Sequence, residues 1–152
     1  MGNNISKINS LGQSIWYDNI SKEMIMSGEL KDLVATGISG LTSNPTIFLK
    51  AIIGSTDYEK QLQKLALKEI GAEEIYEKLV IDDIRAVADL LQPIYDNTEG
   101  ADGYVSLEVN PNLAHETDKT IAEAIRLFDT VNRKNLMIKV PATPAGIPAI
   151  RT

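Results

Sequence analysis

Short apolar runs alternate with longer amphipathic stretches along the 152 residues of this chain. Four of the apolar runs hold about four to eight residues and stop at turn-forming residues, which is the pattern of buried strands. Apolar side chains at helical spacing mark the stretches between these runs. The pattern predicts strands over residues 14–17, 38–42, 103–109 and 136–140, and helices over residues 20–33, 57–70, 73–95 and 117–132.

Two of the predicted helices carry further expectations about their ends and their buried faces. Gly28 interrupts the 20–33 stretch, and Thr117 can cap the start of the last helix through its hydroxyl. In the 57–70 helix the apolar positions near one face are Leu62, Leu65 and Leu67. In the 117–132 helix the positions at helical spacing are Ile121, Ala124, Ile125 and Phe128.

Strands that alternate with helices predict right-handed βαβ units and a parallel sheet, so the fold class is α/β. The stretch between the second and third strands is about twice the ~30 residues of a simple βαβ unit, so we expect extra helices there. A (β/α)₈ TIM barrel needs eight strands and ~250 residues, and this chain offers four strands. The last helix would open near Thr143 and is cut at Thr152, so residues 1–152 are expected to form about half of a larger unit.

Composition and charge restrict the compartment and the partners that we expect for this chain. An apolar content of 43% is sufficient for one hydrophobic core, and the chain has no Cys for disulfides or thiolate chemistry. The segment Met1–Gln13 lacks the features of a signal peptide, and no apolar run approaches the ~20 residues of a membrane span. We expect a soluble cytoplasmic protein. A net charge of −6 argues against nucleic acid as a partner, and an anionic substrate would need a local cationic pocket.

Lys139 is the one charged residue in the apolar run Leu136–Val140. One interpretation is a lysine at a strand end that extends its amine into water. The other is an amine taken out of water, because desolvation disfavours the ammonium and makes the free amine available as a nucleophile toward a carbonyl.

The other strand ends supply polar groups that would suit such an amine. In parallel α/β folds chemistry collects at the carboxyl ends of the strands, which here carry Asp18, Asn44, Glu108 and Lys139. An amine can form an imine, carboxylates can move protons, and an amide can hold hydroxyls.

Each of these residues also has a structural interpretation. Asp18 could cap the helix that starts near residue 20, and Asn44 before Pro45 matches a helix cap followed by proline at the first helical position. Alternation places Glu108 on the face of Tyr104 and Ser106, where an ion pair with Lys139 could be structural only. We interpret His115, the only histidine, as a surface or cap residue without a metal, and Trp16 and Tyr17 as core residues.

Four motifs taken together resemble the successive strand motifs of the transaldolase family, in order and over nearly the whole chain. They are Trp16–Asn19 (WYDN), residues 41–48 (LTSNPTIF), residues 105–109 (VSLEV) and residues 137–143 (MIKVPAT). The resemblance implies the N-terminal half of a (β/α)₈ barrel of the class I aldolase group, without metal or organic cofactor. It also implies transfer of a dihydroxyacetone unit from a ketose phosphate to an aldose phosphate in the non-oxidative pentose phosphate pathway.

The resemblance also implies a role for each candidate residue. Lys139 would be the Schiff-base lysine that attacks the C2 carbonyl of the ketose. Glu108 would move protons through a water, and Asp18 would take the proton of the C4 hydroxyl as the C3–C4 bond breaks. Asn44 would bind hydroxyls of the three-carbon unit. Thr143 would assist substrate binding by contacting the residues that touch the substrate.

The chain departs from the family in its length. Strands five to eight, which carry further hydroxyl-binding residues and the arginine for the substrate phosphate, are missing, so we expect the chain alone to be inactive or nearly so. Two other hypotheses remain open: a class I aldolase that cleaves without transfer, and a non-catalytic half barrel. A half barrel would expose the edges of its first and fourth strands and invite self-association.

Overall fold

The chain folds around one parallel sheet of four strands. The computed structural model describes residues 3–152, and Met1 and Gly2, part of the segment expected to lack a signal peptide, lie outside that range. The strands are paired in the order β1-β2-β3-β4. They are β1 (Trp16–Tyr17), β2 (Gly40–Leu41), β3 (Val105–Glu108) and β4 (Leu136–Lys139). All four predicted strands are confirmed, and each is shorter than its apolar run.

The helices follow the predicted alternation, with additions. They are α1 (Asn4–Asn9), α2 (Lys22–Ser27), α3 (Glu29–Ala35), α4 (Pro45–Gly54), α5 (Glu59–Ala66), α6 (Ala72–Asn97), α7 (Thr117–Val131) and α8 (Gly146–Arg151), with 3₁₀ helices η1 (Thr56–Tyr58) and η2 (Pro111–Leu113). The expected extra helices between the second and third strands are α4, η1 and α5. Gly28 separates α2 from α3 with φ 87°, a left-handed conformation that glycine adopts without strain. Among the helices of residues 3–152, none is both long and apolar enough to cross a membrane.

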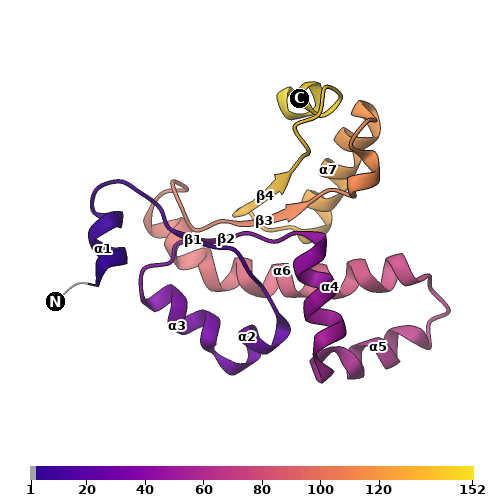
Figure 1. Cartoon of the computed structure of the whole chain (residues 1–152), viewed down its shortest axis with the longest axis horizontal. Coiled ribbons are helices and arrows are strands. Elements are labelled where there is room, and N and C mark those ends of the chain that lie inside the picture. Colours follow the sequence, from indigo (N-terminus) through magenta and orange to yellow (C-terminus); the bar gives the residue numbers. More distant parts are fainter. Residues whose placement is uncertain (1–2) are drawn as a thin grey trace.

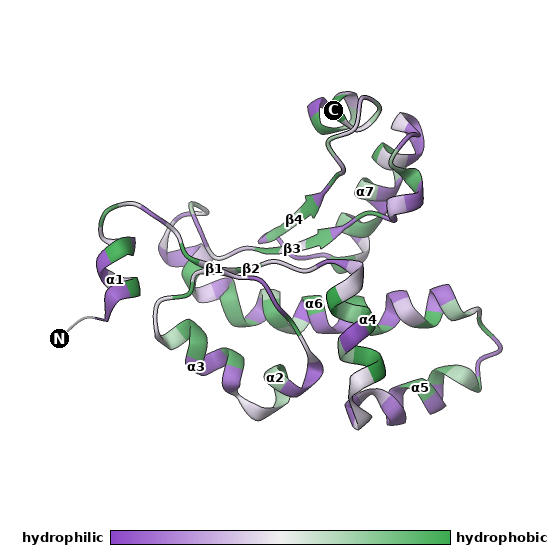
Figure 2. Cartoon of the chain, in the orientation of Figure 1, coloured by the Kyte–Doolittle hydropathy of each residue, from purple (hydrophilic) through white to green (hydrophobic). Residues whose placement is uncertain are grey.

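The helices α2, α3 and α6 lie together along one side of the strands (Figure 1). Figure 2 shows hydrophobic residues along the middle of α6, where this helix lies beside the sheet. The core joins strand residues Leu41, Val105, Leu107 and Leu136, and Val109 directly after β3, to α6 residues Ile81, Ile84, Val87, Ala88 and Leu91. Each fully buried Val, Leu or Ile side chain contributes about 1.5–3 kcal/mol. This core fixes the sheet from one side.

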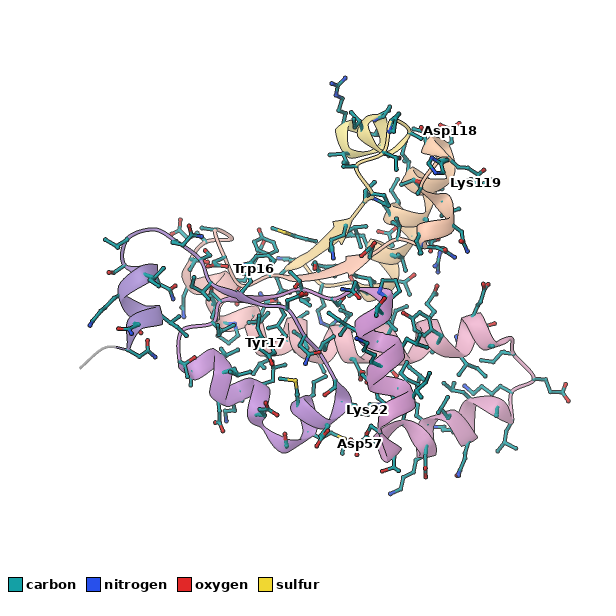
Figure 3. The ribbon with its side chains drawn as sticks, in the orientation of Figure 1. Trp16, Tyr17, Lys22, Asp57, Asp118 and Lys119 are labelled. Carbon is teal, nitrogen blue, oxygen red and sulfur yellow. The ribbon has the colours of Figure 1, made fainter. Side chains whose placement is uncertain are left out.

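The opposite face of the sheet carries the alternate residues of the strands. Met137 on this face is 42% exposed. Trp16 and Tyr17 lie on opposite sides of β1 (Figure 3), and only Tyr17 packs against the core. The Trp16 ring covers Gly40, where a Cβ atom would lie 2.4 Å from it, and stacks on Tyr104 at 6.5 Å between centroids. The expectation that Trp16 is a core residue is therefore wrong, because the strand alternation turns it to the open face.

Three expectations about helix ends and faces are also wrong. Glu116 occupies the N-cap position of α7 without a side-chain bond, while the Thr117 hydroxyl donates to the Ala145 carbonyl at 2.7 Å. Leu67 is 85% exposed because α5 ends one residue before it. Ile125 and Phe128 are exposed on α7, whose buried residues are Thr120, Leu127 and Val131. The apolar stripe of α7 is wide, and its spacing does not show which edge packs against the sheet.

A buried polar cluster joins the extra helices to the rest of the fold. The hydroxyl of Tyr58, a fully buried residue, donates to Asp83 on α6 at 2.6 Å and accepts from the Lys22 backbone N–H at 3.1 Å. Lys22, labelled near Asp57 in Figure 3, places Nζ 3.8 Å from Asp83 and 4.7 Å from the centre of the Tyr58 ring. Burial raises the pKa of the Asp83 carboxyl, and its bond from Tyr58 and the charge of Lys22 oppose that rise. The cluster holds α2, η1 and α6 in one arrangement.

Candidate active site

Lys139 and Glu108 are the centre of the site. They are directly paired in the parallel register of β3 and β4, so their side chains project from the same face of the sheet. Lys139 Nζ lies 3.3 Å from Glu108 Oε2, with side chains 40% and 24% exposed. The predicted facing of Glu108 toward a lysine on the next strand is confirmed. Lys139 is less desolvated than the apolar run suggested, because the face onto which it projects is open.

The amine of Lys139 has a second partner. Nζ donates to the backbone carbonyl of Ser43 at 2.9 Å. A carboxylate and a carbonyl both stabilise an ammonium, which must lose a proton before it can attack a carbonyl carbon. Glu108 is the adjacent group that can accept that proton. The arrangement therefore places an amine 3.3 Å from a carboxylate that can accept its proton.

Asp18 follows β1 and faces the end of β2. Its Oδ1 accepts a hydrogen bond from the Thr42 hydroxyl at 2.5 Å. Helix α2 is capped by Ser21, whose hydroxyl accepts from the Met24 N–H at 3.2 Å. The interpretation of Asp18 as a helix cap is therefore wrong, and its exposed carboxylate is available at the carboxyl end of the sheet.

Asn44 does serve as a helix cap. Its Oδ1 accepts from the Ile47 N–H at 2.9 Å, and Pro45 takes the first position of α4. Such a cap stabilises a helix by about 1 kcal/mol. The contact uses the amide oxygen, so the amide nitrogen is the group that can donate to a ligand. Capping and ligand binding are compatible for this side chain.

Asp18, Asn44 and Glu108 line one cavity of about 520 Å³. The remaining wall consists of Pro45, Thr46, Ile47, Lys50 and Pro111. Lys139 adjoins this cavity through Glu108. Three of the four predicted strand-end residues therefore line one cavity, large enough for a small sugar, and Lys139 contacts one of them, Glu108, without lining it.

Thr143 is engaged elsewhere. Its hydroxyl donates to the Ala114 carbonyl and accepts from the Gly146 N–H at 3.0 Å, where α8 begins. These contacts tie the loop after β4 to the loop after β3. Its supporting role in substrate binding stays a prediction.

The sequence analysis missed several contributors. Thr42 and Ser43 contact the candidate residues directly, and Lys50 is a cation on the cavity wall. Thr42 and Ser43 adjoin Asn44 in the chain, but their contacts reach other strands, so only the assembled sheet reveals them. The sequence could have indicated Lys50 only through its position on α4. It lies less than two helical turns after Pro45, close enough to the strand end to reach the cavity.

A larger cavity of about 640 Å³ lies on the helical side and shares Asn44, Pro45, Glu108 and Pro111 with the first. Tyr76 lines it, and burial, followed by the charge of Glu108, raises the pKa of this phenol. Arg126 also lines it but is held by Glu77 and Glu123, with bonds of 2.5–2.8 Å. This arginine is already neutralised and does not offer a free site for a phosphate.

The residues that the structure describes contain no evident set of ligands for a metal ion. No three His, Cys, Asp or Glu side chains of residues 3–152 come together as they would around an ion. His115 is exposed in the loop before α7, as interpreted from the sequence.

A parallel βα sheet whose strands carry polar side chains at their carboxyl ends is the arrangement on which barrel enzymes build their active sites. The chain belongs to the transaldolase/fructose-6-phosphate aldolase family, whose sequence profile matches residues 15–152. Proteins named "Transaldolase" from Trichodesmium erythraeum (strain IMS101) and Thiobacillus denitrificans (strain ATCC 25259 / T1) are both 48% identical to it, over 149 and 151 residues. These matches cover 97% and 98% of this chain but 39% and 42% of the relatives. The chain thus spans about two fifths of the length of the curated relatives that it matches.

Proposed function

We propose that this chain carries the imine-forming part of a transaldolase active site. The substrates would be sugar phosphates of the pentose phosphate pathway: a ketose phosphate as donor of a dihydroxyacetone unit and an aldose phosphate as acceptor. The observation that carries the proposal is the register-matched pair of Lys139 and Glu108, 3.3 Å apart, on the face that also presents Asp18 and Asn44.

The first half of the reaction forms the imine. The Lys139 ammonium gives a proton to Glu108, and the neutral amine attacks C2 of the ketose to give a carbinolamine. Glu108 returns the proton, through a water, to the carbinolamine hydroxyl, which leaves as water and yields the imine. A protonated imine accepts electrons better than the ketone, so it stabilises the carbanion that follows.

The second half breaks and makes the carbon–carbon bond. Asp18 takes the proton of the C4 hydroxyl, the C3–C4 bond breaks, and its electron pair moves into the imine. An aldose phosphate leaves, and the three-carbon unit stays on Lys139 with its hydroxyls bound by Asn44. Addition to a new aldose reverses these steps: Asp18 returns its proton, and hydrolysis frees Lys139.

Turnover by this chain alone is expected to be low. The cavity wall carries one cation, Lys50, beside two carboxylates, and Arg126 is occupied by Glu77 and Glu123. A phosphate group therefore finds weak electrostatic attraction in the described residues. The intermediate is also exposed, since the open face does not exclude the water that would hydrolyse it.

A second candidate is cleavage without transfer. The family includes fructose-6-phosphate aldolase as well as transaldolase, and either reaction can start from the imine proposed above. The two differ in the fate of the three-carbon unit, which an aldolase releases and a transaldolase delivers to an acceptor. Product analysis with and without an added aldose phosphate separates them.

The test is borohydride reduction in the presence of fructose 6-phosphate, followed by intact-mass analysis and mapping. We expect a three-carbon adduct on Lys139 of the 152-residue chain, and none after Lys139→Ala. Lys134→Ala removes a nearby exposed lysine and is the matched control, in which the adduct should persist. If the Lys139→Ala chain takes up the adduct as well as the original does, the assignment is wrong.

A further inference from the structure

Ser43 lies where β2 leaves the sheet, and its side chain is fully buried. Where β2 pairs with β3, the Leu41 N–H donates to the Tyr104 carbonyl at 3.0 Å. Continued two residues on, a parallel ladder would bring the N–H of residue 43 to the carbonyl of Ser106. The Ser43 hydroxyl donates to that carbonyl, at 2.6 Å. The side chain thus anchors the departing segment to β3.

The backbone of the same residue faces the reactive amine. The Ser43 carbonyl accepts the hydrogen bond from Lys139 Nζ at 2.9 Å. One residue is therefore bound to β3 through its side chain and to the lysine of β4 through its main chain. A carbonyl in a loop without such an anchor would be free to move away from the amine.

The residues on either side of Ser43 restrain the segment further. Thr42 donates to Asp18 at 2.5 Å, and Asn44 caps α4. Residues 42–44 thereby contact Asp18 after β1, Ser106 within β3, Lys139 at the end of β4 and the start of a helix. The position of the Ser43 carbonyl is fixed from both directions along the chain.

We infer that Ser43 is a positioning residue that orients the amine of Lys139, an inference that rests on the imine-forming role proposed above. Once Glu108 has taken the proton, the neutral amine keeps two hydrogens and one lone pair. Donation of one hydrogen to the Ser43 carbonyl restricts rotation of the amine and directs the lone pair toward the cavity. The hydroxyl of Ser43 acts through the backbone and does not touch the substrate.

The test compares Ser43→Ala with the unchanged chain and with Ser39→Ala. Ser39 is a matched control because it is also buried, precedes β2 at the other end, and donates only weakly, at 3.4 Å, to Ile15. The probe is dihydroxyacetone with borohydride, which needs no phosphate site. Digestion then measures the adduct on Lys139 relative to Lys134 in the same sample.

We expect the initial rate of adduct formation on Lys139 to fall about five- to tenfold in Ser43→Ala, the loss that corresponds to one ordinary hydrogen bond. Lys134 labelling and the Ser39→Ala chain should not change. Ser43→Cys keeps the volume of the side chain with a weaker donor, and serves where the alanine variant fails to fold. An unchanged Lys139 rate in a folded Ser43 variant overturns the inference and leaves the imine proposal intact.

A second measurement does not depend on the imine. Nitrogen-15 NMR follows exchange of the Nζ hydrogens of Lys139, which a hydrogen bond to Ser43 should slow in the unchanged chain. We expect exchange to quicken in Ser43→Ala and to stay slow in Ser39→Ala. If Lys139 takes no adduct in any chain, the imine proposal fails, and equal exchange rates in all three chains would refute the positioning role separately.

Discussion

Replacement of Tyr58 by Phe should destabilise the fold strongly although it removes only one oxygen. The hydroxyl lies between a buried carboxylate, 2.6 Å away on Asp83, and the Lys22 N–H, 3.1 Å away. A hydrogen bond to a charged group contributes about 1.5–3 kcal/mol, and an N–H left without a partner costs about 1 kcal/mol or more. We therefore expect a loss of about 3 kcal/mol, equal to roughly 6–12 °C in Tm for a chain of this size.

This loss should depend on pH. Burial raises the pKa of Asp83 from its ordinary value of 3.8, so the folded chain holds this proton more tightly than the unfolded chain. Stability from this group therefore falls as the pH rises from the unfolded value through the folded one. The bond from Tyr58 opposes the raised pKa, and its removal raises the pKa further. The penalty should be largest at pH 7 and should shrink as the pH falls toward the raised pKa of Asp83, because a neutral carboxyl gains less from the Tyr58 hydroxyl.

Urea unfolding at several pH values between 4 and 7 measures both effects. Tyr104→Phe is the matched control, because the Tyr104 hydroxyl donates to a neutral acceptor, the Gly100 carbonyl, at 2.7 Å. Its penalty should be about 1 kcal/mol and constant over this range. A Tyr58→Phe penalty below that of the control, or one that does not vary with pH, would refute the account of the cluster.

The other predictions concern the open face of the sheet. Glu108→Gln should change the free energy of unfolding by less than about 1 kcal/mol, since partly exposed ion pairs contribute little, while borohydride trapping on Lys139 falls at least ~100-fold. An equal loss in both measurements would indicate a structural pair. Gly40→Ala should cost about 1–3 kcal/mol in urea unfolding, because its Cβ would lie 2.4 Å from the Trp16 ring; no loss would contradict that packing. The edges of β1 and β4 should promote self-association, which light scattering after size exclusion detects, and a stable monomer would count against it.

Much of the fold could be predicted because the sequence alternates between two clear patterns, short apolar runs for the strands and apolar residues at helical spacing for the helices. The strand runs are apolar and end at turn-forming residues, and Gly28 marks a real break between two helices. The Asn44–Pro45 pair also predicts the start of α4 correctly. Local chemistry determines these features, so the sequence alone predicts them.

The features that could not be predicted depend on contacts between distant segments. Trp16 lies on the open face of β1. This strand has only two residues, so no alternating pattern in the sequence shows which of them faces the core. Phe128 is exposed because the sheet packs against the other edge of a wide apolar stripe. For the site, the strand ends indicated Lys139 and Glu108, whereas the role of Ser43 depends on its hydrogen bonds to two other strands.

The position of Trp16 gives the molecule a built-in optical signal. It is the only tryptophan of the chain, so its emission arises from one place, beside Gly40 and Tyr104 on the uncovered face. Its indole N–H donates to Asp102 at 3.1 Å, which holds the ring in one orientation. Anything that covers this face, whether a second copy or further strands, would remove water from the ring and shift the emission to shorter wavelength. Fluorescence can therefore follow closure of the sheet without a label.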